Sequence, residues 1–164
     1  MGVIESSNVD GISYLDSNTL TKLKKEATCA THFRSRLCLH QNLISPVQEM
    51  INVFCSECYL RPHRHPVGKT ESYHLIEGTL RIYLFDDHGL VTSQIDLRCG
   101  DKQFPFFFHQ QGGIWHMPVA ITPFVVFHEV YMGPFEKDID VEFAPWSPEY
   151  DDFVAIKQFM AAIK

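Results

Sequence analysis

The sequence lacks an apolar run that approaches the ~20 residues needed to span a bilayer. It also lacks an excess of positive charge: the formal net charge is −6, whereas a general nucleic-acid binder presents a basic face. No basic segment followed by an apolar stretch stands at the N-terminus, so we expect no secretory signal. These absences exclude a helical membrane protein and a general nucleic-acid binder, and they predict a cytoplasmic protein.

The sequence has an odd number of cysteines, five. An odd number without a secretory signal predicts reduced thiols rather than a disulfide framework. Cys55 and Cys58 form a C-x-x-C, but the surrounding I-N-V-F-C-S-E-C-Y-L is typical of a strand. Positions three apart on a strand face opposite sides. We therefore predict that no disulfide or zinc ion joins these two thiols.

Internal repeats, low-complexity tracts and long linkers are absent as well. The length of 164 residues fits one domain, and the hydrophobic share of 45% with 13 phenylalanines predicts a packed core. We expect three parts. They are a loose N-terminal segment (1–15), a barrel with an N-terminal helix (16–146) and a C-terminal helix packed on the barrel (147–164).

Short β-branched and aromatic runs between turn residues predict a mostly β chain. The candidate strands are Arg36 to Leu39, Ile51 to Leu60, Ser72 to Ile76, Thr79 to Phe85, Val91 to Leu97, Gln103 to Phe108, Ile114 to Pro118 and Phe124 to Tyr131. A hairpin is predicted at Asp86 to Gly89. A helix capped by one of residues 16–18 should run to about Ala30, and Ser147 with Pro148 should start the last helix. Evenly spaced strands predict a sandwich or barrel.

Three histidines and one glutamate form the main candidate site: His63, His65, Glu71 and His116. Side chains at i and i+2 of a strand share a face, so His63 and His65 aim two imidazoles at one point. The short loop after them can return Glu71 to their side, and a later strand can supply His116. Three neutral nitrogens and a carboxylate suit a divalent transition ion and leave coordination positions open. The sequence therefore predicts a mononuclear metal site.

Two glycines complete a pattern around these residues: Gly78 follows Glu71, and Gly113 stands three positions before His116. H-x-H, then Glu, then Gly, then a late G-x-x-H resembles the cupin family. That resemblance implies a mostly β cupin double-stranded β-helix, or jelly-roll barrel, with a short N-terminal helix and a C-terminal helix. The gap between His65 and Glu71 is longer than is usual in cupins. Glu71 is thus either a metal ligand or a carboxylate that supports the ligands.

Further motifs resemble the WbuC-like cupin-fold metalloproteins and cover nearly the whole chain. They are R-S-R-L-C-L-H, R-P-H-R-H, E-S-Y-H-L-I-E-G, F-D-D-H-G, F-H-E-V-Y-M-G-P and F-A-P-W-S-P. The resemblance implies polysaccharide or O-antigen biosynthesis, with a sugar or nucleotide-sugar related substrate. It also implies a homodimer, because cupins often pair strands or sheets across subunits. The aromatic run Phe104 to Phe108 is typical of a strand that serves both a core and a dimer interface.

Two residues are candidates for binding a substrate. Arg61 stands two positions before His63, so we expect it on the metal-facing side, inside the barrel. A guanidinium there would bind a carboxylate or phosphate, or pair with a structural glutamate. His40 is a candidate at the pocket mouth, with a solvated or interface histidine as the alternative.

Two further residues are candidates for catalysis. Tyr73 shares a strand face with Glu71 and can reach the pocket. Glu129 is an acid among aromatic residues, which is typical of a general base or of the partner of a buried arginine.

Two classes of function remain open. In a metalloenzyme, Fe, Zn, Mn or Ni would support dioxygenase, isomerase or decarboxylase chemistry on a small, possibly anionic molecule such as a sugar or carboxylate. In a non-catalytic binding or regulatory module, a structural metal would help to hold a small molecule. His and Glu ligands accommodate several first-row metals, so the donor set does not identify the ion.

Overall fold

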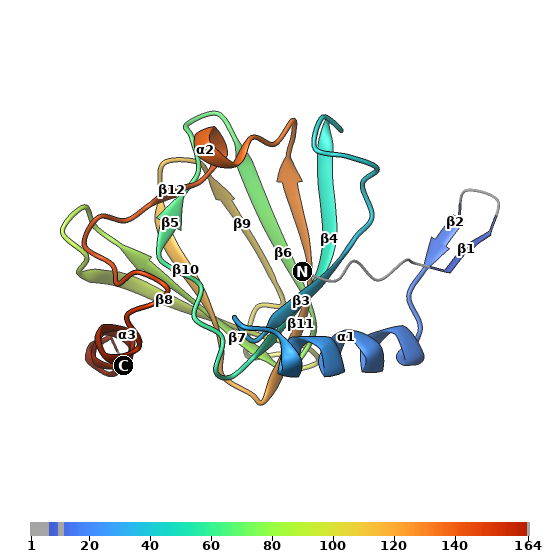
Figure 1. The fold of residues 1–164 in the computed structure, drawn as a ribbon, viewed down its shortest axis with the longest axis horizontal. Coiled ribbons are helices and arrows are strands. Elements are labelled where there is room, and N and C mark those ends of the chain that lie inside the picture. Colours follow the sequence, from blue (N-terminus) through green and yellow to red (C-terminus); the bar gives the residue numbers. More distant parts are fainter. Residues whose placement is uncertain (1–6, 10–11, 164) are drawn as a thin grey trace.

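The computed structural model describes residues 7–9 and 12–163, and within them two antiparallel sheets face each other (Figure 1). The elements are β1 (Ser7–Val9), β2 (Ile12–Tyr14), α1 (Ser17–Cys29), β3 (Arg34–Cys38), β4 (Val47–Cys55), β5 (His63–Arg64), β6 (Thr70–Glu77), β7 (Thr79–Phe85), β8 (Val91–Arg98), β9 (Phe107–Gln111), β10 (Trp115–Ala120), β11 (Phe124–Met132), α2 (Lys137–Asp140), β12 (Glu142–Phe143) and α3 (Phe153–Ala162). Of the segment expected to be loose, residues 1–6 and 10–11 lie outside the described part, and β1 pairs with β2.

Each of the two large sheets has five strands. One has the order β3-β4-β11-β6-β9, and the other has the order β12-β5-β10-β7-β8. Neighbours in each sheet are antiparallel, and strands that follow one another in the chain often lie in different sheets. The connection between β7 and β8 is the predicted hairpin at Asp86 to Gly89, which is confirmed. In the described residues, no helix combines the length and apolar character that crossing a membrane requires.

The space between the sheets is apolar at one end and polar at the other. Along β11, the inward-facing Val125 and Phe127 belong to the buried core, whereas the next inward positions are Glu129 and Tyr131. The same change occurs on β6, where Leu75 lies in the core and Glu71 lies at the polar end. Because side chains alternate along a strand, one set of strands builds both a core and a site.

Helix α1 covers the outer face of the first sheet. Its Leu23 and Ala27 pack against Leu37 and Val53, and all four side chains are fully or almost fully buried. The backbone N–H of Thr19 donates to the carboxylate of Asp16, which caps the helix, so the predicted helix start is confirmed.

The C-terminal segment covers the outer face of the second sheet, on a different side of the β structure from α1 (Figure 1). Aromatic side chains make this contact: Trp146 and Phe159 pack near Phe85. Helix α3 begins at Phe153, not at Ser147 as predicted, because Asp152 supplies the cap by accepting from the Ala155 N–H.

Two strands have different bounds from those predicted, because a local turn lies beside each of them. The chain turns after Cys55, where the Cys58 N–H donates to the Cys55 carbonyl, so the strand predicted for residues 51–60 ends early. The Gln103 and Phe104 N–H groups both donate to Asp101, and this turn shifts β9 toward the C-terminus relative to the predicted strand. Cys55 and Cys58 are nevertheless free thiols.

Candidate metal centre

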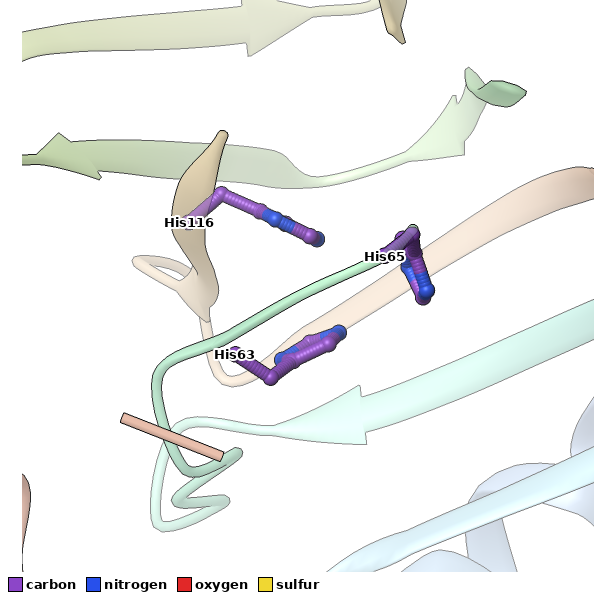
Figure 2. A group of neighbouring side chains, drawn as sticks. All are labelled: His63, His65 and His116. Carbon is purple, nitrogen blue, oxygen red and sulfur yellow. The ribbon is translucent and has the colours of Figure 1, made fainter. Parts of the chain in front are cut away.

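Three imidazoles meet at the polar end of the space between the sheets. His63 lies on β5, His65 directly follows it, and His116 stands opposite His63 on the neighbouring strand β10. The ring centroids of His63 and His116 are 4.3 Å apart, and His65 lies 5.2 Å from His63 and 5.3 Å from His116. Figure 2 shows the three side chains projecting into one space. One candidate ligand atom from each histidine lies within 4.8 Å of the others, and all three residues are buried.

Backbone carbonyls orient all three rings. The Nδ1 atoms of His63, His65 and His116 lie 3.0, 2.7 and 3.0 Å from the carbonyl oxygens of Arg61, Asp140 and Ile114. A carbonyl only accepts, so each Nδ1 carries the hydrogen. The lone pair of each neutral ring is therefore on Nε2. This arrangement fixes the tautomer that binds a metal ion through Nε2.

Glu71 on β6 brings a carboxylate to the same point. Its Oε1 lies 3.3 Å from His65 Nε2, and its Oε2 lies 3.1 Å from His116 Nε2. Gln110 on the neighbouring β9 donates to Oε2 at 2.8 Å and holds the carboxylate in place. The structure thus brings together all four residues that the sequence singled out for the metal site.

The electrostatics keep His63 neutral and Glu71 ionised, which are the charge states that a metal needs. Burial, and then the neighbouring His116 and His65, hold the pKa of His63 well below its ordinary value. Burial opposes ionisation of Glu71, but His116 and His65 outweigh it and hold the pKa of Glu71 well below its ordinary value. Burial also works against charging His65, yet the nearby Glu71 raises its pKa. The Glu71 carboxylate therefore stays charged in a buried place, and a cation between this carboxylate and the imidazoles would stabilise it.

The donor set fits a divalent transition metal. The Nε2 atoms of His65 and His116 are buried and have no hydrogen-bond partner within the described residues. A buried acceptor without a partner is costly, and a metal ion would satisfy both nitrogens and the adjacent carboxylate together. His63, His65 and His116 would hold the ion, with Glu71 as a further ligand or as a supporting acceptor.

A cavity of about 290 Å³ extends from this cluster toward the edge strand β3. His63, His65 and Glu71 form part of its wall. Apolar side chains, among them Phe54, Leu60 and Phe143, line much of the remainder. A mostly apolar cavity with a few convergent polar groups is typical of a small-molecule site.

The two candidate catalytic residues both line the cavity. Tyr73 is fully buried, and burial together with Glu71 and Glu129 raises its pKa well above the ordinary value. The Asn52 amide donates to Glu129 at 2.7 Å. Burial, and then repulsion by Glu71, raises the pKa of Glu129 to about 8. An acid that titrates near neutral pH is suited to proton transfer.

The two candidate substrate-binding residues differ in their placement. His40 lines the cavity, and its Nδ1 accepts from the Glu49 N–H at 3.0 Å. Arg61 precedes β5 and does not line the cavity. Its guanidinium donates to Ser147, to the Ala144 carbonyl and to Glu149, and lies over the Phe143 ring.

Arg61 was expected on the same strand face as His63, but β5 begins only at His63, so this alternation does not extend back to Arg61. Pairing with a structural glutamate was the alternative for Arg61, and the structure shows Glu149 as that partner. We therefore assign no ligand-binding role to Arg61.

Sequence reasoning missed several residues that position the site. Asn52 holds Glu129, and Gln110 holds Glu71. Asp140 accepts from the Tyr131 hydroxyl at 2.6 Å, while its own backbone carbonyl orients His65. Strand pairing was the missing information, because Asn52 and Gln110 become neighbours of these acids only across β4–β11 and β6–β9.

Comparison with solved structures shows which fold this is. A structural-genomics target from Shewanella oneidensis has a TM-score of 0.56 and 14% identity, covering 78% of this chain and 82% of that one. L-ribose isomerase from Cellulomonas parahominis without ligand has a TM-score of 0.53 and 15% identity, covering 68% of this chain and 69% of that one. Oxalate oxidase in complex with the substrate analogue glycolate has a TM-score of 0.53 and 16% identity, covering 72% of this chain and 58% of that one.

The comparison shows a cupin-type double-stranded β-helix fold, so the predicted fold class is confirmed, and this fold carries the buried cluster of three histidines. Residues 15–97, just over half of the chain, match the family described as a domain of unknown function, DUF6016. The chain belongs to this family. No curated protein matches it.

Proposed function

We propose that this chain is a mononuclear metal-binding cupin that acts as a metalloenzyme on a small molecule in the cavity. One observation carries the proposal: three buried imidazoles, each with Nδ1 on a backbone carbonyl, point their Nε2 atoms at one place beside the Glu71 carboxylate. When bound, the ion supplies Lewis acidity and an open coordination position. The solved structures with this fold include an isomerase and an oxidase, which supports a catalytic rather than a purely structural use of the fold.

The residues around the ion support proton transfer as part of the chemistry. Glu129 lines the same cavity as His63, His65 and Glu71 and titrates near neutral pH in the metal-free protein. Asn52 fixes one of its oxygens and leaves the other to exchange a proton with a ligand. Tyr73 remains a neutral hydroxyl beside it, because its pKa is raised. We propose Glu129 as the general acid or base and Tyr73 as a hydrogen-bond donor to the substrate.

The substrate class follows from the resemblance to WbuC-like proteins and from the cavity. A space of about 290 Å³ accommodates a small sugar, hydroxy acid or sugar acid, and polysaccharide biosynthesis in the cytoplasm would provide such molecules. We keep the ion open between Fe, Zn, Mn and Ni, because His and Glu ligands suit all four.

Cobalt substitution tests the proposal. Protein stripped with a chelator is loaded with Co(II), and its visible absorption is followed during titration with sugars, hydroxy acids and sugar acids. We expect a one-to-one Co(II) spectrum that shifts when a ligand enters the cavity, and NMR of the same mixtures should show turnover. A spectral shift without turnover of the bound molecule would favour the binding-module alternative. Absence of any Co(II) spectrum would contradict the proposal.

We also propose a homodimer. Phe106 and Phe107 lie at β9, an edge strand of the first sheet, and are 54% and 51% exposed. An exposed apolar edge favours association between copies of the chain. Light scattering of wild type and Phe107→Ser tests this proposal, since wild type should have twice the mass of the variant.

A further inference from the structure

The six arginines of the chain fall into two groups. Four of them form ion pairs with carboxylates: Arg61, Arg64, Arg81 and Arg98. The other two, Arg34 and Arg36, form no ion pair within the part of the chain that the structure describes. These two arginines both line the cavity of the metal centre.

Arg34 and Arg36 lie side by side because of their register on β3. They stand opposite Phe54 and Asn52 of β4, and as positions i and i+2 they share the inward face of the sheet. Arg34 is half-buried and Arg36 is exposed. The Arg36 guanidinium makes a weak hydrogen bond of 3.8 Å to the sulfur of Met50. Two neighbouring guanidinium groups repel each other unless an anion lies between them.

The strand that carries the two arginines lies away from the strand that carries Glu71. Three strand steps separate β3 from β6, which carries Glu71, and at ~4.8 Å per step this is on the order of 14 Å along the sheet. A ligand that contacts both ends therefore needs two separate polar groups.

The charge of the cavity is opposite to that of the chain. The charged side chains in its wall are the cations Arg34, Arg36 and Lys137 and the acids Glu71 and Glu129. Three cations and two carboxylates leave the wall with a net positive charge. A bound dication would add two further positive charges. A positive cavity in a protein of formal net charge −6 concentrates and orients anions.

We propose that Arg34 and Arg36 form an oxyanion-binding subsite, so that the ligand of this site carries a carboxylate or phosphate group at the end away from the metal. A guanidinium group binds either oxyanion through a pair of N–H donors. Two guanidinium groups on one strand face can therefore contact a carboxylate or phosphate from two sides. This inference rests on the proposed function for the ligand's other end, which faces the ion. The subsite itself needs only the two arginines and can be tested without metal.

Calorimetry on chelator-treated protein provides the test, with inorganic phosphate and malonate as probes in a low-salt Tris buffer. We expect saturable one-to-one binding of at least one probe by wild type. Arg34→Gln and Arg36→Gln should each raise its Kd about tenfold or more, as expected for loss of a charge-assisted hydrogen bond. The matched control is Arg98→Gln, which removes an arginine that pairs with Asp96 outside the cavity and should leave Kd unchanged.

Arg34→Lys and Arg36→Lys serve as second variants, because they retain the charge and the packing of the stem but lose the fork. They should bind the probe with intermediate affinity. Lack of saturable binding by wild type, an unchanged Kd in either Gln variant, or an equal loss in Arg98→Gln would overturn the subsite. Metal content is measured on the same batches of protein before the chelator treatment. Wild type without metal but with arginine-dependent anion binding would reject the proposed function alone, whereas metal binding without such anion binding would reject this inference alone.

Discussion

Glu71 Oε2 lies 3.1 Å from His116 Nε2 in the protein interior, although His116 places its hydrogen on Nδ1 and thus turns a lone pair toward the carboxylate. Two acceptors at this distance are stable only with a cation between them, either a proton or a metal ion. Gln110 anchors the carboxylate from the other side, so the pair cannot separate without losing that hydrogen bond. This relationship is the physical basis for the metal centre and for the first prediction.

Glu71→Gln should weaken metal binding by about tenfold or more, the range seen when a carboxylate in or beside a metal shell is lost. The amide keeps the volume of the side chain but removes the charge that attracts the ion. Competition with a chromophoric chelator measures the change. The control is Glu142→Gln, which removes an exposed carboxylate that pairs with Arg64. Equal affinity in wild type and Glu71→Gln would show that Glu71 neither binds nor supports the ion.

Glu129→Gln should change how the stability of the metal-free protein depends on pH. The pKa of Glu129 rises from 4.5 to about 8 on folding, so the folded state holds a proton that the unfolded state releases. This group therefore makes stability fall as pH rises through that window. The variant should lose that fall and gain about 1–2 kcal/mol relative to wild type near pH 8, a value discounted for solvent screening. Denaturant unfolding at pH 5 and pH 8 measures it, and parallel curves would contradict the raised pKa.

Gly112→Ala should damage the site through the backbone. A Cβ at Gly112 would lie 1.8 Å from the Pro66 carbonyl oxygen, in the loop that follows His65, so the loop has to move. We expect a loss of about 1–3 kcal/mol, as for overpacking, together with weaker metal binding.

The matched control is Gly68→Ala in the same loop. Nothing lies within 4 Å of a Cβ there, although its φ of +94° still strains an alanine. That strain should cost about 1–2 kcal/mol and spare the metal. Unfolding curves measure the stability of the two variants, and metal analysis measures how much metal each one binds. Equal metal content in both would contradict the expected displacement of His65.

Thiol titration tests the cysteine assignment. Protein denatured without reductant under anaerobic conditions should show all five thiols, since the structure has all five free. In the native protein, exposed Cys29 and Cys99 should react first. Cys58 should react last, because burial raises its pKa to about 12 and suppresses the thiolate. Fewer than five thiols in the denatured protein would indicate a bond that the fold does not contain.

The sequence predicted best where local chemistry decides the structure. Asp86 to Gly89 fixes a hairpin through turn residues, and Asp16 fixes a helix start through one hydrogen bond. The histidine pair was predictable because alternation along a short extended segment is local. His116 was found through a motif, since its pairing with His63 joins positions far apart in the chain.

The errors arose where contacts between distant segments decide. Ser147 is typical of a helix cap, but its hydroxyl accepts from Arg61 and donates to the Ala144 carbonyl instead. The same contact removes Arg61 from the cavity, and no pattern around Arg61 indicates it. Arg34 and Arg36 were noted only as part of an upstream motif, because their place in the cavity depends on β3 pairing with β4.

Metal stoichiometry by mass spectrometry, on protein purified without chelator and then reloaded with Fe(II), Zn(II), Mn(II) or Ni(II), tests the central claim most directly. Wild type and the control His109→Ala, which changes an exposed histidine on β9, should each bind one ion per chain with at least one of these metals. His63→Ala combined with His116→Ala should bind none while keeping the circular dichroism of a β protein. Full retention of metal by the double variant, or no metal on wild type under any of these conditions, would contradict the account.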